Sequence, residues 1–294
     1  MRTESEHIAY VLHKRPFRET SVLVDLFCRD QGRIRAVARG ARGKHGAKRL
    51  YLEPFTPLLV TWRGNSGLKT LVRAESAAQA KPSLLGHTLY LGFYVNELLM
   101  RLLAEDDAHE YLYQHYSELL LRLSSSNIST SNSATADLVA TDVSNADLSN
   151  VDLSNTSNLE PLLRVFELSL LEEIGYALPL DTDSLSGAPV AADTWYRLIP
   201  GDGLVSVPAY DGASRHELFS GAHLLAMAAT SYQDNEVRKC AKRLLRLALA
   251  NQLGNKPLRS REFFESYSKN LIETTGSIGL KTATPSMGSN ESQS

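Results

Sequence analysis

The hydrophobic pattern of this chain changes its period once, a little more than a quarter of the way along its 294 residues. Before that point apolar residues alternate with polar or small ones, as at Ile8, Tyr10 and Leu12, which is the period of half-buried strands. After it they recur every three or four positions, as they do on one face of an amphipathic helix. The sequence therefore predicts a β-rich domain over residues 1–80 and a helical domain over residues 81–273.

Short alternating runs separated by turn residues predict five strands in the first domain. The runs lie at residues 8–12, 22–26, 33–39, 55–62 and 68–74. No helical pattern between them is long enough for the crossover that joins parallel neighbours, and a Gly- and Asn-rich hairpin loop joins the last two. A small antiparallel barrel is expected, and the five-stranded OB-fold is the commonest barrel of this size.

Three segments depart from the helical pattern of the second domain. Residues 124–158 are rich in Ser, Asn and Thr, with an Asp every five positions from Asp137 to Asp152, and we expect a surface insertion rather than an ordered β-helical coil. Residues 176–220 contain several Pro and Gly and predict a small β-hairpin subdomain. Residues 274–294 predict a disordered tail. The expected fold class is α+β, an OB-fold barrel followed by an α-helical domain with this β insertion.

Positive charge is concentrated near the start of the chain. Residues 1–81 contain 16 Lys and Arg against 7 Asp and Glu, whereas the other 213 residues contain 15 against 26. Such a difference between two parts of a chain suggests that the basic part binds a polyanion. A basic region that serves only solubility is the simpler alternative.

The densest basic run, residues 29–49, contains eight basic residues and one acidic residue. In the third expected strand Arg33, Arg35 and Arg39 fall on one face by the two-residue period, and small apolar residues fall on the other. We therefore expect a row of guanidinium groups on the outside of the barrel, followed by a glycine-rich basic loop. Flexible cations of this kind suit a nucleic-acid backbone that is bound without base-specific geometry.

The residues expected to contact nucleic acid extend from the first strand to the loop after the third. They are Lys14, Arg15, Arg18, Arg33, Arg35, Arg39, Arg42, Lys44, Lys48 and Arg49. Aromatic residues in the same domain, Phe17, Tyr51, Phe55 and Trp62, are candidates for stacking on bases, although core packing is their more common role. The alternative for the whole set is a solvated charged face without a ligand.

A second basic cluster is expected on one helix of the other domain. Arg238, Lys242 and Arg246 repeat every four residues, and Lys239 and Arg243 lie beside them. Apolar residues of the same helix border this stripe, so the surface would suit an acidic peptide with a hydrophobic end. A solvated face on a surface helix is an equally good interpretation.

Motifs for catalysis are missing from the sequence. No Walker A loop, G-x-G-x-x-G, H-E-x-x-H or G-x-S-x-G occurs. The two cysteines, Cys28 and Cys240, are too few for a four-cysteine zinc site. No apolar run reaches the ~20 residues of a membrane helix, and no apolar signal segment follows the N-terminus. We expect a cytoplasmic protein that is not an enzyme and that holds no metal or cofactor.

Five segments, in order along the chain, resemble the bacterial recombination mediator family RecO. They are residues 10–21 (YVLHKRPFRETS), 32–42 (GRIRAVARGAR), 52–58 (LEPFTPL), 89–99 (LYLGFYVNELL) and 256–262 (KPLRSRE). The resemblance covers residues 8–270 apart from the insertion at 124–158. It implies an N-terminal OB-fold that binds single- and double-stranded DNA, a helical C-terminal domain, and a cytoplasmic, nucleoid-associated protein.

The resemblance also implies partners. The family anneals complementary strands coated by single-stranded DNA-binding protein (SSB), and with RecR it helps RecA to load during gap repair, without hydrolysing a nucleotide. It recognises the acidic, hydrophobic-ended C-terminal tail of SSB on the helical domain, and Arg164 matches a basic position of the family. The residues expected to bind that tail are Arg164, Arg238, Lys239, Lys242, Arg243 and Arg246.

The chain departs from the family pattern in two places. Many members carry a four-cysteine zinc site in the region that corresponds to residues 176–220, and those cysteines are absent here, so hydrogen bonds and packing are expected to hold the subdomain. The insertion at 124–158 has no counterpart. Two other functions stay open: an OB-fold RNA-binding protein acting in RNA folding or translation, and a metal-dependent hydrolase that uses acidic residues and histidines of the helical domain.

Overall fold

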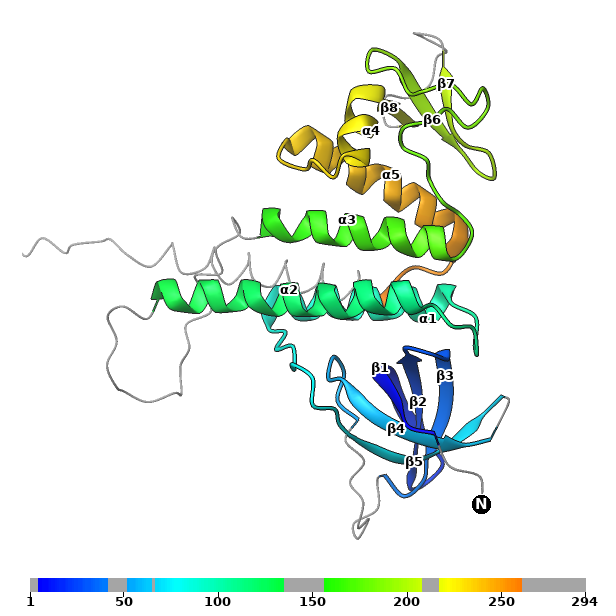
Figure 1. Cartoon of the computed structure of the whole chain (residues 1–294), viewed down its shortest axis with the longest axis vertical. Helices are drawn as coiled ribbons and strands as arrows, with labels where there is room; N and C mark the ends of the chain where they lie inside the picture. The colour runs from blue at the N-terminus through cyan, green and yellow to red at the C-terminus, as the bar shows by residue number, and fades with distance from the viewer. Residues whose placement is uncertain (1–4, 42–51, 65–66, 135–155, 208–216, 261–294) are drawn as a thin grey trace, which may run out of the picture.

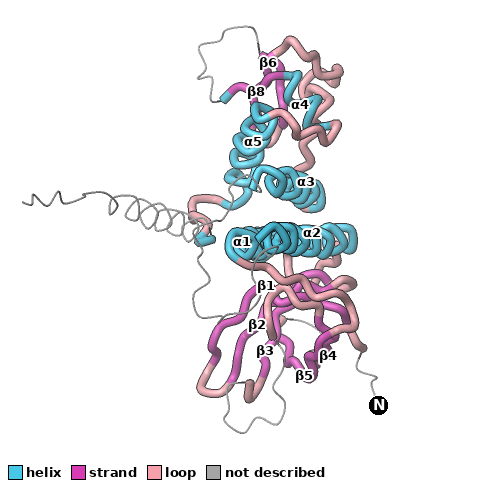
Figure 2. Tube along the Cα trace, turned by 90° about the vertical axis from the view of Figure 1, so that its left-hand side faces the viewer, coloured by secondary structure: helices cyan, strands magenta, loops and turns pink. Residues whose placement is uncertain are grey.

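The computed structural model describes residues 5–41, 52–64, 67–134, 156–207 and 217–260. The molecule is elongated: the N-terminal strands lie at one end, long helices lie in the middle, and a small sheet lies at the other end (Figure 1). A view turned by 90° shows the same layers, with two helices lying directly over the N-terminal strands (Figure 2).

Five strands close into a barrel: β1 (His7–Phe17), β2 (Ser21–Cys28), β3 (Gly32–Ala38), β4 (Leu58–Arg63) and β5 (Lys69–Ser76). Their order around the barrel is β1-β2-β3-β5-β4. Small and aliphatic side chains fill the interior, among them Val24, Leu26, Ile34 and Ala36. The predicted five-stranded barrel of the OB type is confirmed. The expectation of a wholly antiparallel barrel was wrong at one seam, because β5 returns after β4 and meets β3 running in the same direction.

Five helices follow the barrel: α1 (Gly86–Leu102), α2 (Glu110–Ala134), α3 (Thr156–Glu173), α4 (Gly221–Ala228) and α5 (Asn235–Leu253). Helix α1 packs on β1, α2 packs on α3, and α5 lies against both α3 and α4. Each of these helices buries an apolar face in these contacts.

The barrel and the helices share one core. The rings of Tyr10 and Phe27 on the outside of the barrel pack against Tyr116 of α2, with the Tyr10 and Tyr116 centroids 5.2 Å apart. Asn96 of α1 accepts a hydrogen bond from the Tyr116 hydroxyl at 2.6 Å and donates one to the Leu12 carbonyl of β1 at 3.0 Å. Burial raises the pKa of the Tyr116 hydroxyl, which therefore remains a hydrogen-bond donor. The two domains are thus joined by shared packing and by buried hydrogen bonds.

The insertion expected at 124–158 begins later than predicted, because α2 continues to Ala134. Serine is a poor helix former because its hydroxyl competes for backbone groups. Here the Ser125 and Ser126 hydroxyls donate to the carbonyls of Arg122 and Leu123, three residues earlier, and so remain compatible with the helix. Residues 135–155 and the expected tail at 274–294 lie outside the described residues.

The small sheet lies where a β-hairpin was expected. It consists of β6 (Trp195–Ile199), β7 (Gly203–Val207) and β8 (Leu218–Ser220) in the order β7-β6-β8. The buried Asp183 carboxylate accepts hydrogen bonds from the amides of Leu185, Ser186 and Ser206. The bonds from Ser186 and Ser206 hold the pKa of this carboxyl well below its usual value. A carboxylate therefore ties the preceding loop to the free edge of β7.

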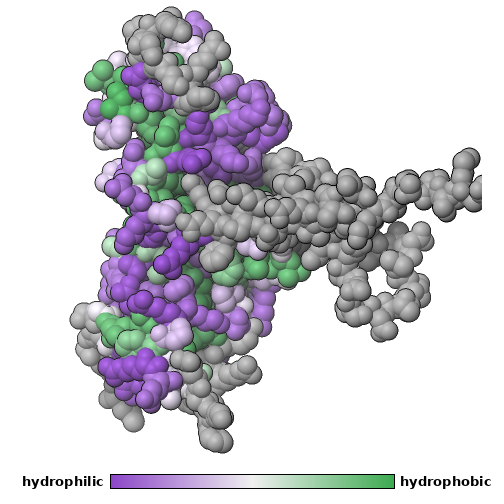
Figure 3. Space-filling model, turned by 180° about the vertical axis from the view of Figure 1, so that it is seen from behind, coloured by the Kyte–Doolittle hydropathy of each residue, from purple (hydrophilic) through white to green (hydrophobic). Residues whose placement is uncertain are grey.

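The described surface is largely polar on the face seen from behind, where hydrophilic side chains surround smaller apolar areas (Figure 3). None of the helices within the described ranges combines the length and the apolar character that a membrane crossing requires. Within those same ranges, no three His, Cys, Asp or Glu side chains are grouped closely enough to hold a metal ion.

Candidate nucleic-acid interface

A groove of about 860 Å³ runs along the outside of the barrel between two loops. The β1–β2 turn forms one wall, the start of β5 forms the other, and the end of β3 lies between them. The lining residues are Phe17, Arg18, Glu19, Thr20, Ser21, Val37, Arg39, Leu68, Lys69 and Thr70. OB-folds bind oligonucleotides in this position, between the β1–β2 and β4–β5 loops and across the middle strands.

Two exposed guanidinium groups stand in this groove. Arg18 lies in the β1–β2 turn with a φ of 53°, and its guanidinium carbon lies 5.3 Å from the centre of the Phe17 ring. Arg39 follows the last residue of β3 and is also exposed. Lys14 and Arg15 are exposed on β1, and the Lys14 ammonium donates to the Leu52 carbonyl at 2.9 Å. The groove therefore combines an aromatic ring with solvent-exposed cations.

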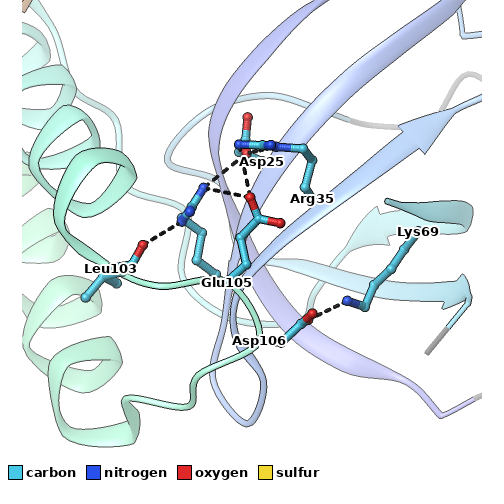
Figure 4. Close-up of polar contacts among 7 residues, drawn as sticks. Asp25, Arg35, Lys69, Leu103, Glu105 and Asp106 are labelled. Carbon is cyan, nitrogen blue, oxygen red and sulfur yellow. Dashed lines mark hydrogen bonds and ion pairs between the residues drawn. The ribbon is translucent and has the colours of Figure 1, made fainter. Parts of the chain in front are cut away.

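The other two arginines of the predicted row are paired with acidic side chains of the protein itself. Arg33 is buried rather than exposed, so this part of the prediction was wrong, and its Nε atom donates to the Leu103 carbonyl at 3.0 Å. Arg35 lies with its Nε atom 3.1 Å from Asp25 Oδ1 and its Nη2 atom 3.1 Å from Glu105 Oε1. Figure 4 shows Asp25, Arg35 and Glu105 converging between the barrel and the end of α1. Two carboxylates thus neutralise two arginines.

The loop between α1 and α2, residues 103–109, covers this part of β3 and explains the burial of Arg33. The Asp106 amide donates to the Arg33 carbonyl at 2.9 Å, and the Asp106 carboxylate pairs with the buried Lys69 ammonium (Figure 4). Gly32 permits this approach, because a Cβ there would lie 1.5 Å from the Asp107 carbonyl oxygen. The loop is therefore held in a defined position against the barrel.

Four further predicted contacts, Arg42, Lys44, Lys48 and Arg49, lie outside the described residues, as does Tyr51. Among the three aromatic candidates that the structure describes, Phe17 alone lines the groove. Phe55 is buried and packs on Phe93, with ring centroids 5.1 Å apart, and Trp62 stacks on His7 at 4.2 Å. Their role is packing, as the sequence favoured.

The structure separates the predicted tail-binding residues into two groups. Lys239, Lys242 and Arg246 are exposed on α5, and Leu247, which follows Arg246 in the same helix, is 40% exposed. The two lysines form surface ion pairs with Glu236 at 2.8 Å and Glu160 at 3.2 Å. Ion pairs of this kind are weak and exchange easily.

The remaining three arginines are held by internal contacts. Arg238 donates to the carbonyls of Tyr232 and Gln233, and Arg243 donates to the Leu218 carbonyl at 2.7 Å and lies over the Phe219 ring. Arg164 is 8% exposed and pairs with the buried Glu167 carboxylate at 2.8 Å. These side chains stabilise the helical domain in the structure.

The described residues give little support to a catalytic or metal site. Both cysteines are buried, and burial raises the pKa of each thiol, that of Cys240 to about 11. Thiols of this kind stay protonated at neutral pH, whereas a nucleophile or a metal ligand must be a thiolate. His109 lies between Glu173, at 3.0 Å, and Asp107, at 3.7 Å, and this contact joins the α1–α2 loop to α3.

Sequence reasoning missed three residues of this region. Leu68 and Thr20 line the groove, although the sequence indicated only the start of a strand at Leu68 and a connection between two strands at Thr20. Glu105 belongs to the acidic run Glu105-Asp106-Asp107, which the sequence presents as a break between two helices. Its charge was visible, whereas its contact with a residue 70 positions earlier was not.

Comparison with known proteins identifies similar chains. The family model described as "Recombination protein O N terminal" matches residues 1–80, and that described as "Recombination protein O C terminal" matches residues 148–262. A protein named "DNA repair protein RecO" from Stutzerimonas stutzeri is 44% identical over 256 residues, which cover 87% of this chain and 92% of that protein. Proteins of the same name from Haemophilus influenzae and Actinobacillus succinogenes are 40% and 39% identical, over 87% and 90% of this chain and 93% and 97% of theirs.

Proposed function

Because this chain belongs to the RecO family, we propose that it is a DNA repair protein that binds single-stranded DNA in the groove of its barrel. The observation that carries the proposal is the position of Arg18 and Arg39 in the groove where OB-folds bind oligonucleotides. The names of its relatives refer to DNA repair. Exposed cations at such a site attract a phosphate backbone and release its bound counterions.

The proposed activity is the annealing of complementary strands that are coated by SSB. Two strands repel each other through their phosphates, and a protein that neutralises some of those phosphates lowers this repulsion. Base pairing then supplies the free energy, so the step needs no nucleotide and no covalent chemistry. Together with RecR, the protein would also promote the loading of RecA onto such strands, a role that membership of the family supports.

SSB is the partner that we propose for the exposed face of α5. Its C-terminal tail is acidic with a hydrophobic end, and α5 carries both the exposed cations Lys239, Lys242 and Arg246 and the exposed apolar side chain of Leu247. Of the predicted tail-binding set, these three are the direct contacts in the proposal. Arg164, Arg238 and Arg243 would not contact the tail directly. They would stabilise the helices that form this surface, because their guanidinium groups already donate to backbone carbonyls or pair with a carboxylate.

A binding titration tests the proposal. Fluorescence anisotropy of a labelled single-stranded oligonucleotide should show binding that weakens steeply as salt rises, with a slope of roughly 0.7 released ions for each phosphate contacted. The same titration with single-stranded and structured RNA distinguishes the RNA-binding alternative. A clear preference for structured RNA, or binding that is indifferent to salt, would refute the DNA assignment.

A further inference from the structure

We infer that Glu105 limits the strength and the extent of DNA binding, because its carboxylate takes the place of a phosphate on Arg35. The inference rests on the proposed DNA binding and adds a residue that determines its affinity. Glu105 belongs to the helical domain, so the second domain would control how much of the basic face of the barrel DNA can use.

The first argument is the position of Arg35 relative to the groove. The outward positions of β3 are Arg33, Arg35 and Val37, and Arg39 follows the strand. Val37 and Arg39 line the groove. At ~3.3 Å per residue, the backbone of Arg35 lies roughly 7 Å beyond that of Val37 on the same face. Arg35 therefore lies next to the groove, on the same outward face of β3 as the groove residues Val37 and Arg39.

The second argument is charge. Arg33 and Arg35 face Asp25 and Glu105, so the four side chains carry no net charge together. The two acids are not equivalent: the Asp25 side chain is 4% exposed, whereas that of Glu105 is 30% exposed and that of Arg35 is 37% exposed. A phosphate that approaches from water therefore meets the Glu105–Arg35 pair first and must compete with Glu105.

The third argument is that Glu105 is held in place by its neighbours in the chain. The Arg33 Nε atom donates to the Leu103 carbonyl on one side, and the Asp106 amide donates to the Arg33 carbonyl on the other. The Asp106–Lys69 ion pair adds a third anchor (Figure 4). The carboxylate is thus presented to Arg35 before any DNA arrives, and its removal should leave the loop attached.

The test compares Glu105→Gln with Asp107→Asn, which removes one charge from the same loop. The Asp107 side chain is 64% exposed, and its ion contact is with His109 rather than with a barrel arginine. We expect Glu105→Gln to tighten oligonucleotide binding by roughly fivefold and to steepen the salt dependence by about 0.7 released ions. Asp107→Asn should raise the affinity by less than half as much, which is less than about 2.5-fold.

Arg35→Gln supplies the specific control. In a double-mutant cycle, the gain from Glu105→Gln should disappear when Arg35→Gln is added. An unchanged affinity in Glu105→Gln, an equal gain in Asp107→Asn, or a gain that survives in the double variant would overturn the inference. If the wild-type protein shows no salt-dependent DNA binding, the proposed function itself fails instead.

A separate comparison decides the matter if Glu105→Gln does not fold. In the otherwise unchanged protein, Arg35→Gln should weaken binding by less than about twofold, since Glu105 and Asp25 already neutralise Arg35. Arg39→Gln should weaken it more, because Arg39 is exposed in the groove. Equal losses in the two variants would show that Arg35 is available to DNA and would contradict the inference.

Discussion

The Arg35 Nη2 atom lies 3.1 Å from the Glu105 Oε1 atom, so a barrel strand and the loop between two helices share an ion pair. This contact divides the basic face of the barrel into two parts. Arg18 and Arg39 remain exposed in the groove, whereas Arg33 and Arg35 are compensated by acids. The division determines which substitutions should affect DNA and which should affect stability.

Neutralising the groove should weaken DNA binding without unfolding the protein. The double variant Arg18→Gln, Arg39→Gln removes two exposed cations, and we expect roughly tenfold weaker binding of single-stranded DNA with a salt slope lower by about 1.4. Anisotropy titrations at several salt concentrations measure both quantities. Arg122→Gln, which removes one exposed cation outside the groove, is the control, because Arg122 lies on α2 and pairs with Glu118 four residues away. An equal loss of DNA affinity in the control would show that the groove is not the DNA-binding site.

The exposed face of α5 should be needed for SSB but not for naked DNA. Replacing Lys242 and Arg246 by Glu makes the exposed face of α5 acidic, and we expect about tenfold weaker binding of a peptide with the sequence of the SSB C-terminal tail. Isothermal titration calorimetry measures this, and affinity for an oligonucleotide should stay within about twofold. Arg122→Glu, which reverses one exposed charge on α2, controls for charge reversal elsewhere on the helical domain. Unchanged binding of the peptide would place the tail on another surface.

Arg164→Gln should act on stability. The variant removes the Arg164–Glu167 ion pair, in which the Glu167 side chain is 1% exposed, and losing one member of a buried pair costs about 3–5 kcal/mol. Urea denaturation measures the free energy of unfolding. Lys242→Gln, which breaks an exposed pair with Glu160, should change it by less than ~1 kcal/mol. A stable Arg164→Gln protein that no longer binds the SSB tail would instead make Arg164 a direct contact.

The β subdomain should lose stability in acid through Asp183. The pKa of this carboxyl is lowered in the folded state, so its contribution is complete above the ordinary Asp pKa of about 3.9 and is lost as the pH falls below that value. We expect Asp183→Asn to lower the melting temperature at pH 7 and to differ progressively less from the wild type below about pH 4. Thermal melts from pH 7 to pH 2.5 measure this. If the difference in melting temperature between the two proteins stays constant over that range, the stabilisation comes from packing rather than from the Asp183 charge.

The interior of β3 was predictable, and its exterior was not. Ile34 and Ala36 were assigned to the inner face from the two-residue period alone, because that period is local. Arg33 is buried by the loop of residues 103–109. A contact between residues so far apart in the sequence produces no periodic pattern from which it could be predicted. The basic row was therefore read correctly as outward-facing, while its exposure was overestimated.

The extent of α2 was underestimated for a different reason. Helix propensity assigns Ser and Asn to loops, and the Ser-rich stretch after Leu123 looked like the start of an insertion. Ser125 and Ser126 instead donate to carbonyls of the preceding turn. Propensity averages over such local hydrogen bonds, so the boundary was placed too early.

The most direct measurement of the central claim is the annealing of two complementary oligonucleotides coated with SSB, in the absence of nucleotide and metal. It should be run with the wild-type protein and with the Arg18→Gln, Arg39→Gln variant, each with complete SSB and with SSB that lacks its C-terminal tail. We predict fast annealing only for the wild-type protein with complete SSB. Equally fast annealing by the groove variant would contradict the assignment of DNA binding to this groove.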